Sequence, residues 1–161
     1  MKRRLYIYGT GAHARKVFHC STACGYEVAG FVDEDPLGRS PVVGFCVWPA
    51  ASLPAPTAGD AIFVAIGRAE VRKRLMDGLT KAGWDCPVLV HPSAAVSPDA
   101  RLEAGVLVAA GAVIETATVV ERGAIVDIGV LVDHDCMVGS FGHLKPGEVL
   151  GAGTKVSSPF E

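Results

Sequence analysis

The stretch that decides the fold is residues 96–156, VSPDARLEAGVLVAAGAVIETATVVERGAIVDIGVLVDHDCMVGSFGHLKPGEVLGAGTKV. An aliphatic residue recurs along it at every sixth position without a slip. Counted from the preceding repeat, this row is Val90, Val96, Leu102, Val108, Ile114, Val120, Val126, Val132, Val138, Leu144, Leu150 and Val156. A helical stripe needs spacings of three and four residues, and a hairpin meander needs turns flanked by a period of two, so neither explains the pattern.

Two further rows complete each repeat. Glycine is common three positions after the aliphatic residue, where a corner with positive φ is expected. Mostly small residues stand four positions after it, namely Ala94, Ala100, Val106, Ala112, Thr118, Ala124, Val130, Cys136 and Gly142. Each hexapeptide therefore predicts one short strand and a corner, with the aliphatic and small side chains pointing inward. Three hexapeptides make one triangular coil.

Residues 1–90 show an alternation of strand and helix signals instead. Strands are predicted at residues 5–8, 27–32 and 61–66, and helices at residues 12–24 and 69–82, the second with Val71, Leu75 and Leu79 on one face. The second strand stops at acidic residues and Pro36. Residues 36–60, rich in Pro, Gly and Ala, predict no defined element. We expect a small parallel sheet in this part, and hence two domains, residues 1–90 and 91–161.

The loop after the first predicted strand reads Gly9-x-Gly11-x-x-Ala14, with Asp33 after the second strand. This matches the dinucleotide fingerprint, in which backbone amides and a helix N-terminus hold a pyrophosphate and the acid holds a ribose. A tight strand-to-helix turn alone would need the same glycines. His13 either donates a hydrogen bond to such a ligand or caps the turn. NAD is not expected, because a full six-strand sheet does not fit before residue 90.

Composition excludes several classes of function. The net charge is -2 and the basic residues are scattered, so no nucleic-acid partner is expected. The apolar runs are too short for a secretory signal or a membrane span, which predicts a cytoplasmic protein without membrane insertion. The five cysteines form no Cys-x-x-Cys pair and are expected to pack as small apolar residues.

The repeat separates core residues from candidates for chemistry. Cys136 falls in the inward row, which favours packing over a nucleophilic role. His134 stands at a corner between Asp133 and Asp135. Asp135 occupies a position where glycine is common, so its presence has a purely conformational explanation. A histidine held by a carboxylate is also what a general base requires.

His143 follows nine residues after His134 and belongs to a different edge of the coil. Neighbouring subunits would be needed to bring two such edges together. A zinc site of three histidines from adjacent chains, as in carbonic-anhydrase-type β-helices, is the weaker alternative, because His91 is the one further histidine in the repeat region and precedes its core.

Several motifs occur in a fixed order, namely Tyr8-Gly9-Thr10-Gly11-Ala12-His13-Ala14, Phe31-Val32-Asp33-Glu34, Val64-Ala65-Ile66-Gly67, His91-Pro92-Ser93-Ala94 and Val132-Asp133-His134-Asp135-Cys136. In this combination the chain resembles, over nearly its whole length, the bacterial sialic-acid and nucleotide-amino-sugar acetyltransferases. The resemblance implies a small Rossmann-like parallel α/β domain followed by a left-handed parallel β-helix. It also implies a homotrimer, with acetyl-CoA between neighbouring β-helices. No metal cofactor is expected.

The activity implied is an acetyl-CoA-dependent N-acetyltransferase of a nucleotide-linked amino sugar in surface glycan biosynthesis. By resemblance, His134 would take a proton from the sugar amine and Asp135 would raise the basicity of His134. His143 and Lys155 would contact acetyl-CoA, and a main-chain amide near Gly151 and Ala152 would face the developing oxyanion. The residues that would line the sugar-nucleotide site are Gly11, Ala12, His13, Asp33, Glu34 and Gly67.

The sequence departs from the family at two places. Asp127-Ile128-Gly129 stands where the family commonly has Asn-Thr-Gly. Relatives also continue for further hexapeptides that hold the CoA tail, whereas this sequence stops at Ser157-Ser158-Pro159-Phe160-Glu161. The alternatives are a sialic-acid or sugar O-acetyltransferase, and a non-catalytic trimeric module that binds a nucleotide sugar but lacks the last acyl-CoA coils.

Overall fold

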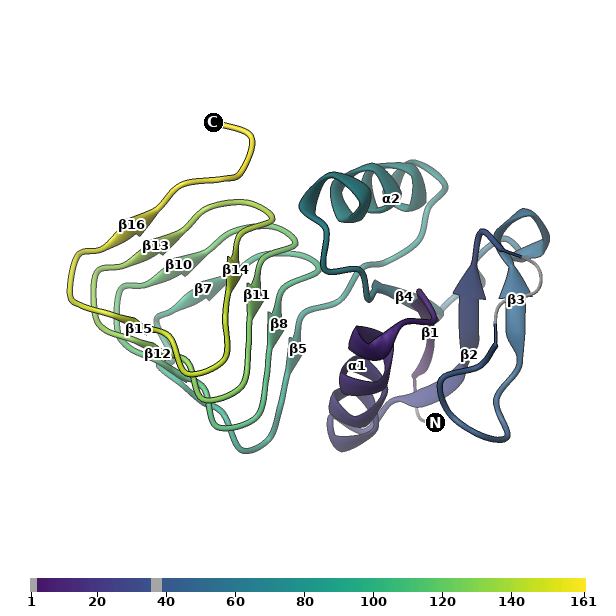
Figure 1. The fold of residues 1–161 in the computed structure, drawn as a ribbon, viewed down its shortest axis with the longest axis horizontal. Coiled ribbons are helices and arrows are strands. Elements are labelled where there is room, and N and C mark those ends of the chain that lie inside the picture. Colours follow the sequence, from purple (N-terminus) through teal and green to yellow (C-terminus); the bar gives the residue numbers. More distant parts are fainter. Residues whose placement is uncertain (1–2, 36–38) are drawn as a thin grey trace. The chain divides into compact units, whose positions relative to one another are not determined.

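The computed structural model describes residues 3–35 and 39–161, and the chain divides into two compact units, Met1–Pro87 and Val88–Glu161 (Figure 1). Pro36, the expected stop of the second strand, lies outside the described residues. Within the described ranges, neither α-helix has the length and apolarity needed to cross a membrane.

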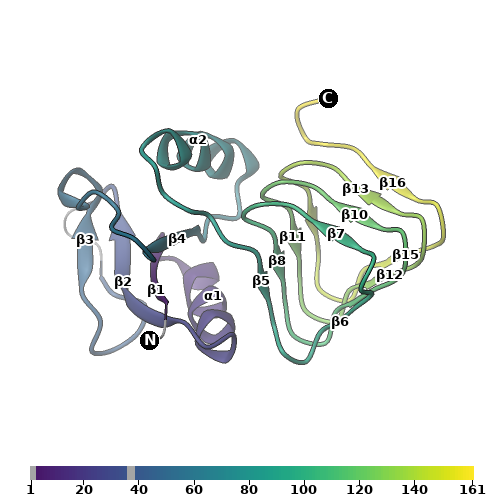
Figure 2. The same ribbon diagram turned by 180° about the vertical axis from the view of Figure 1, so that it is seen from behind.

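The first unit is a four-stranded parallel sheet with two helices. Its elements are β1 (Arg4–Tyr8), α1 (Ala12–Ala23), β2 (Glu27–Asp33), β3 (Val47–Pro49), η1 (Ala50–Ser52), β4 (Ala61–Val64) and α2 (Ala69–Lys81). The strand order is β3-β2-β1-β4, and all neighbouring strands are parallel. The sheet and its helices can be followed from both sides in Figures 1 and 2.

The two helices cover opposite faces of this sheet. Phe31 of β2 meets Phe18 of α1, with ring centroids 6.1 Å apart. Tyr8 lies in register with Val32, one residue after Phe31, and borders a hollow with Leu75 and Leu79 of α2. Because successive strand side chains point to opposite faces, Phe31 and Tyr8 mark the α1 face and the α2 face. The loop after β1 therefore leads to one side of the sheet and the loop after β4 to the other.

The elements expected from the sequence are confirmed with small shifts at their ends, but β3 and η1 were not predicted. Each spans only three residues, in a stretch whose Pro and Gly obscure any period. The apolar face of α2 is also shifted. Arg72, Met76 and Leu79 are its buried residues, whereas Val71 and Leu75 are half-buried because they border hollows.

The second unit is a parallel β-helix of two-residue strands. They are β5 (Leu89–Val90), β6 (Ala95–Val96), β7 (Arg101–Leu102), β8 (Leu107–Val108), β9 (Val113–Ile114), β10 (Val119–Val120), β11 (Ile125–Val126), β12 (Leu131–Val132), β13 (Met137–Val138), β14 (His143–Leu144), β15 (Val149–Leu150) and β16 (Lys155–Val156). They form three sheets with the orders β14-β11-β8-β5, β15-β12-β9-β6 and β16-β13-β10-β7. Every third strand pairs in parallel, so three hexapeptides make one coil, as the period predicted (Figure 1).

The core of this unit consists of the two predicted inward rows. From Val108 to Leu150 every member of the aliphatic row is buried, and Val106, Ala112, Ala124, Val130 and Cys136 of the small row pack beside it. Ala117, Asp135 and Phe141 adopt φ of 56, 58 and 60° at corners where most repeats have glycine. Asp tolerates this conformation better than most residues.

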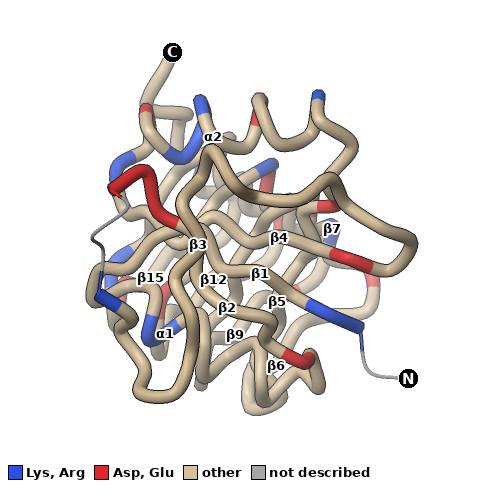
Figure 3. Tube along the Cα trace, turned by 90° about the vertical axis from the view of Figure 1, so that its right-hand side faces the viewer, with Lys and Arg blue, Asp and Glu red and all other residues tan. Residues whose placement is uncertain are grey.

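Charged residues are dispersed in both units. Figure 3 shows Lys and Arg segments interspersed with Asp and Glu segments along the described chain.

Candidate active site

The carboxyl edge of the parallel sheet carries the glycine motif. Gly9 has a φ of +117°, and a Cβ there would lie 2.8 Å from Ile66 Cδ1 and 3.0 Å from the Ala65 carbonyl oxygen. Its amide donates to the Val32 carbonyl at 2.7 Å. Gly9 therefore fixes the close approach of the loops after β1 and β4, which is the structural role that the fingerprint allows. Because these loops lead to opposite faces of the sheet, they also mark the position where α/β sheets bind ligands.

Gly11 serves a different purpose. It is the N-cap of α1 with a φ of −76°, and nothing lies within 4 Å of a Cβ built on it. Gly11, as the N-cap residue, makes no side-chain cap hydrogen bond and the first turn of the helix has no acidic residue, so the N-terminus presents main-chain amides with a positive dipole. Ala12 is exposed and His13 half-buried in this turn.

Asp33 ends β2 on the same edge and is held in place. Its Oδ2 accepts a hydrogen bond from Thr10 Oγ1, and its Oδ1 accepts one from the Asp35 amide at 3.0 Å. The fingerprint glycine loop and its acid are thereby tied to each other. Glu34 is exposed and pairs with Arg74 of α2 at 3.1 Å.

The loop after β4 is supported by an arginine that the sequence did not single out. Arg72 is 1% exposed, and its Nη1 donates to the carbonyl oxygens of Ile66 and Gly67 at 2.8 and 2.9 Å. Burial lowers the pKa of Arg72 to about 10, so it stays charged at neutral pH. Gly67 is exposed, with nothing within 4 Å of a built Cβ. Arg72 thus fixes the loop through its Ile66 and Gly67 carbonyl groups, while the space around the Gly67 Cα stays open.

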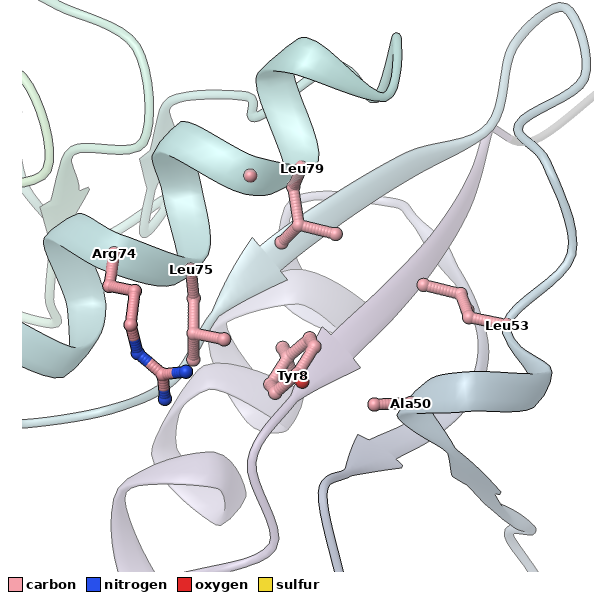
Figure 4. A pocket seen from close by; sticks show the side chains of 7 residues that line it. Tyr8, Ala50, Leu53, Arg74, Leu75 and Leu79 are labelled. Carbon is pink, nitrogen blue, oxygen red and sulfur yellow. The ribbon is translucent and has the colours of Figure 1, made fainter.

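Two hollows adjoin this edge. The smaller, about 80 Å³, is bordered by Tyr8, Gly9, Asp33, Glu34, Ile66, Val71 and Leu75. The larger, about 290 Å³, is bordered by Tyr8, Ala50, Leu53, Arg74, Leu75, Gly78 and Leu79. In Figure 4, Arg74, Leu75 and Leu79 project from α2 toward Tyr8 at the end of β1, with Leu53 and Ala50 on the other side. Burial, and then the charge of Glu34, raise the pKa of Tyr8 above its usual value.

In the β-helix unit, His134 lies at the exposed corner between β12 and β13. Asp133 Oδ1 accepts the His134 amide at 2.8 Å, and His134 Nδ1 lies 2.6 Å from Asp135 Oδ2. The Asp135 amide donates to the Thr116 carbonyl one coil earlier at 3.1 Å, and Gly153 donates to the His134 carbonyl at 2.9 Å. Both neighbouring coils therefore fix the backbone that presents this pair.

The pKa of His134 is raised above its ordinary value. The hydrogen bond to Asp135 is the largest cause, followed by the charge of Asp133, with a smaller contribution from Glu115. Because Nδ1 is engaged by Asp135, Nε2 is the nitrogen able to take a proton from a ligand. The arrangement is that of a general base held by a carboxylate.

A hollow of about 290 Å³ lies on the adjoining β15-β12-β9-β6 sheet. It is bordered by Val113, Glu115, Leu131, Val132, Asp133, Val149, Leu150 and Gly151. Val113, Leu131 and Val149 are outward-facing partners in successive strands, and Leu131 and Val149 are 45% and 65% exposed. The corner with His134 therefore adjoins an exposed apolar strip, the row Val113–Leu131–Val149.

His143 lies on another sheet, on β14, as the period predicted. Its Nε2 is 3.2 Å from Oδ2 of the buried Asp127, and its Nδ1 is 3.1 Å from Lys145 Nζ. Asp127, which follows β11, the strand paired with β14, thus holds His143. The structure does not bring His134 and His143 together within the chain.

The remaining expected CoA contacts are dispersed over the later coils. Val132 pairs with Leu150, so Gly151 and Ala152 follow at the His134 corner one coil later. Cys136 is 2% exposed and its Sγ lies 3.2 Å from the Gly151 carbonyl, which confirms that Cys136 packs inward. Lys155 is exposed on β16.

Sequence reasoning missed three groups at these sites. The apolar strip could have been predicted from the sequence. Residues eighteen positions apart in an outward-facing row lie next to each other in successive coils, and Val113, Leu131 and Val149 are such a series. The burial of Arg72 had a weaker sequence signal, since Arg72 shares a helical face with the apolar Met76 and Leu79. The hollow at Tyr8 had no sequence signal, because Ala50 and Leu53 belong to residues 36–60, in which no period is visible.

Comparison with known proteins agrees with both units. Residues 4–79 match the family described as the PglD N-terminal domain. The acetyltransferase domain of PglB from Neisseria gonorrhoeae FA1090 has 32% identity and a TM-score of 0.85, covering 96% of this chain and 77% of that one. A further structure of that domain, in complex with acetyl coenzyme A, has 27% identity and a TM-score of 0.72, covering 98% of this chain and 86% of that one.

PerB from Caulobacter crescentus, solved in complex with CoA and GDP-perosamine, has 38% identity and a TM-score of 0.81, over 92% of this chain and 70% of that one. No curated protein matches the sequence. The likeness to these structures confirms the expected fold class, a Rossmann-like α/β domain followed by a left-handed parallel β-helix.

Proposed function

The chain belongs to the bacterial hexapeptide-repeat family of sialic-acid and nucleotide-amino-sugar acetyltransferases, and from this premise we propose that it is an acetyl-CoA-dependent N-acetyltransferase of a nucleotide-linked amino sugar in surface glycan biosynthesis. The observation that carries the proposal is the pair His134–Asp135, with 2.6 Å between Nδ1 and Oδ2, at an exposed corner beside an apolar hollow. The glycine-loop edge of the first unit accounts for the nucleotide part of the acceptor.

His134 is the proposed base. Its Nε2 takes the proton of the acceptor amine as the nitrogen bonds to the acetyl carbon and the carbon–sulfur bond breaks, and then returns a proton to the departing sulfur. Asp135 orients the ring and stabilises the imidazolium. An amide at Gly151 or Ala152 donates to the acetyl oxygen as it gains negative charge. Acetyl-CoA supplies the activated acetyl group.

In the first unit, the proposed acceptor site uses the open positions of the edge. The amides at Gly11, Ala12 and His13 suit the diphosphate, because the N-cap residue is a glycine without a side chain that could bond to them. Asp33 and Glu34 suit the ribose hydroxyls, and Gly67 leaves space for the sugar. Thr10 and Arg72 are proposed as positioning residues, since they hold Asp33 and the carbonyls before Gly67.

We also propose a homotrimer with acetyl-CoA between adjacent β-helices, bound by His143 and Lys155. The exposed strip Val113–Leu131–Val149 supports association, because a contiguous apolar row is an expected interface. His143 lies on β14 and His134 at the corner between β12 and β13, so in our proposal a second subunit brings both to one ligand. The proposed location is the cytoplasm, where both co-substrates are made.

The test is acetyl transfer by His134→Ala, assayed as CoA release from acetyl-CoA with nucleotide-linked amino sugars. We expect at least roughly a hundredfold loss of kcat without a change in circular dichroism or in the mass of the oligomer. His19→Ala, at an exposed histidine of α1, is the matched control and should keep parental rates. Parental rates in His134→Ala would rule out the mechanism, and transfer only to hydroxyl acceptors would favour an O-acetyltransferase.

A further inference from the structure

The imidazole of His143 links the side chains of an acid and a lysine on successive coils of the β-helix. Asp127 follows β11 and Lys145 follows β14, and Val126 and Leu144, the last residues of these strands, are in register. Asp127 and Lys145 therefore occupy the same corner position, one coil apart. His143 Nε2 lies 3.2 Å from Asp127 Oδ2, and His143 Nδ1 lies 3.1 Å from Lys145 Nζ.

These two contacts fix the protons of the cluster. A lysine ammonium only donates hydrogen bonds, and a carboxylate only accepts them. The neutral ring of His143 therefore carries its hydrogen on Nε2, toward Asp127, and presents the Nδ1 lone pair to Lys145 Nζ. Transfer of one proton from Nζ to Nδ1 gives a neutral amine beside an imidazolium. A nucleophile next to a histidine that a carboxylate holds is the order of groups in a catalytic triad.

Asp127 favours this proton transfer. It is 3% exposed, and its Oδ1 accepts a hydrogen bond from the Ile128 amide at 2.8 Å, which fixes the orientation of the carboxylate. Charges interact more strongly where water is excluded. The carboxylate at Nε2 therefore stabilises the imidazolium that forms when His143 takes the proton.

The backbone of Lys145 is fixed while its side chain is open to solvent. The Lys145 amide donates to Glu148 Oε2 at 2.7 Å, and the Glu148 amide donates to the Lys145 carbonyl at 3.1 Å. Within the same turn, the Gly147 amide donates to the Ile128 carbonyl of the preceding coil at 2.9 Å. Lys145 is exposed, so a small electrophile can reach Nζ.

We propose that Lys145 is a site at which this chain is acetylated by acetyl thioesters. His143 is the base that activates Nζ, and Asp127 is the residue that positions His143. The inference rests on the proposed function only for the natural acetyl donor, acetyl-CoA, which that function places at His143.

The reaction balances in protons and electrons. His143 Nδ1 takes one proton from the ammonium, and the freed lone pair of Nζ attacks the acetyl carbon. The carbon–sulfur bond breaks as the carbon–nitrogen bond forms, and the sulfur keeps the electron pair. A second proton passes from the nitrogen to the departing thiolate, and the imidazolium releases the first proton to solvent. An ammonium and an acetyl thioester thus give a neutral acetyl-lysine, a free thiol and one proton.

The first test incubates the full chain with acetyl-CoA and no acceptor sugar, and follows acetylation of each lysine by quantitative peptide mass spectrometry. Lys73 is the matched control in the same molecule, because its Nζ lies 2.8 Å from Asp77 Oδ2 and pairs with a carboxylate instead of an imidazole. We expect Lys145 to be acetylated at least about tenfold faster than Lys73, because general base catalysis acts at Lys145 alone of the two. Equal rates at the two lysines would overturn the proposal.

A second test uses S-acetyl-N-acetylcysteamine, a thioester without a nucleotide, so that binding of CoA does not enter the rate. With this donor, His143→Gln should bring the rate at Lys145 down to about that at Lys73, and Asp127→Asn should lower it at least about threefold. The rate at Lys73 should stay the same in both variants, which shows that they are folded. A rate at Lys145 that is unchanged in both variants would overturn the role of His143.

The assay with amino sugars separates this inference from the proposed function. A parent that acetylates a nucleotide-linked amino sugar, but modifies Lys145 no faster than Lys73, would refute the acetylation site and leave the enzyme. A parent that acetylates Lys145 through His143, but transfers no acetyl group to any nucleotide-linked amino sugar, would support the acetylation site and refute the enzyme.

Discussion

Asp99 and Asp135 occupy equivalent positions of one corner of the β-helix, two coils apart, and their carboxylates are used differently. Asp99 accepts from Ser97 Oγ at 2.7 Å, from Thr116 Oγ1 at 2.5 Å and from the Ala117 amide at 3.2 Å. Asp135 instead lies 2.6 Å from His134 Nδ1. One carboxylate stabilises the stack of coils and the other holds an imidazole.

The difference lies in the backbone as well as in the preceding residue and the next coil, because Asp135 has a φ of 58° whereas Asp99 is not among the described non-glycine residues with a positive φ. Thr116 and Ala117 supply donors to Asp99 from the following coil, and Pro98 before it has no side-chain nitrogen. Asp135 follows a histidine, and its own amide is bonded to Thr116. The same residue type on the same row is therefore structural in the first case and, in our proposal, catalytic in the second.

The largest expected effect is on the rate of Asp135→Asn. Asparagine tolerates a φ of 58°, so the corner should fold as before. It carries no charge to stabilise an imidazolium, and its amide nitrogen would favour the wrong tautomer of His134. We expect kcat for acetyl transfer to fall by roughly a hundredfold or more, with an unchanged melting temperature. A variant that loses melting temperature but keeps kcat would make Asp135 structural, like Asp99.

Asp99→Asn should show the opposite behaviour. Hydrogen bonds from Ser97 and Thr116 are the main causes that lower the pKa of Asp99 from 3.8 to about 2. A carboxyl whose pKa is lowered by folding stabilises the protein above its unfolded pKa, and this contribution is lost as pH falls through the folded pKa. The variant should therefore melt below the parent at neutral pH, and the difference should vanish between about pH 4 and pH 2. Melting temperatures of the parent and of Asp99→Asn, measured at neutral pH and across that range, check the effect. The kcat of Asp99→Asn for acetyl transfer should equal that of the parent.

Ala117→Gly is expected to have the smallest effect. Ala117 lies between the two aspartates in the same column, with a φ of 56°. Glycine removes the steric cost of this conformation, so the variant should gain about 1 kcal/mol in the free energy of unfolding. Chemical denaturation measures it. A loss of kcat here would show that the corner depends on rigidity beyond the His134–Asp135 pair.

The sequence was sufficient to predict the corner of the β-helix, but not the side-chain hydrogen bonds that Asp99 and Asp135 make there. The six-residue period placed Cys136 inside and put Asp135 at a positive-φ corner, because stacked coils leave few positions for each residue type. The period could not predict that Asp99 accepts hydrogen bonds from the next coil whereas Asp135 contacts the adjacent His134. Those contacts depend on side-chain rotamers and on donors about eighteen residues away in the sequence.

The first unit was predicted less completely, for a different reason. Its strands and helices are long enough to show a period, but β3 and η1 are not. The loops between elements decide which side chains border the hollow at Tyr8. Arg72 was missed because a buried arginine that binds loop carbonyls looks, in sequence, like one more surface charge.

The most direct test of the central claim, that His134 held by Asp135 is the base, compares two titrations. Two-dimensional NMR gives the pKa of His134, which the Asp135 hydrogen bond should raise above 6.5, and the acid limb of kcat/KM reports the group that must be deprotonated for transfer. We predict that the two agree in the parent and that both move to lower pH in Asp135→Asn. An acid limb that stays in place while the pKa of His134 falls would contradict the account.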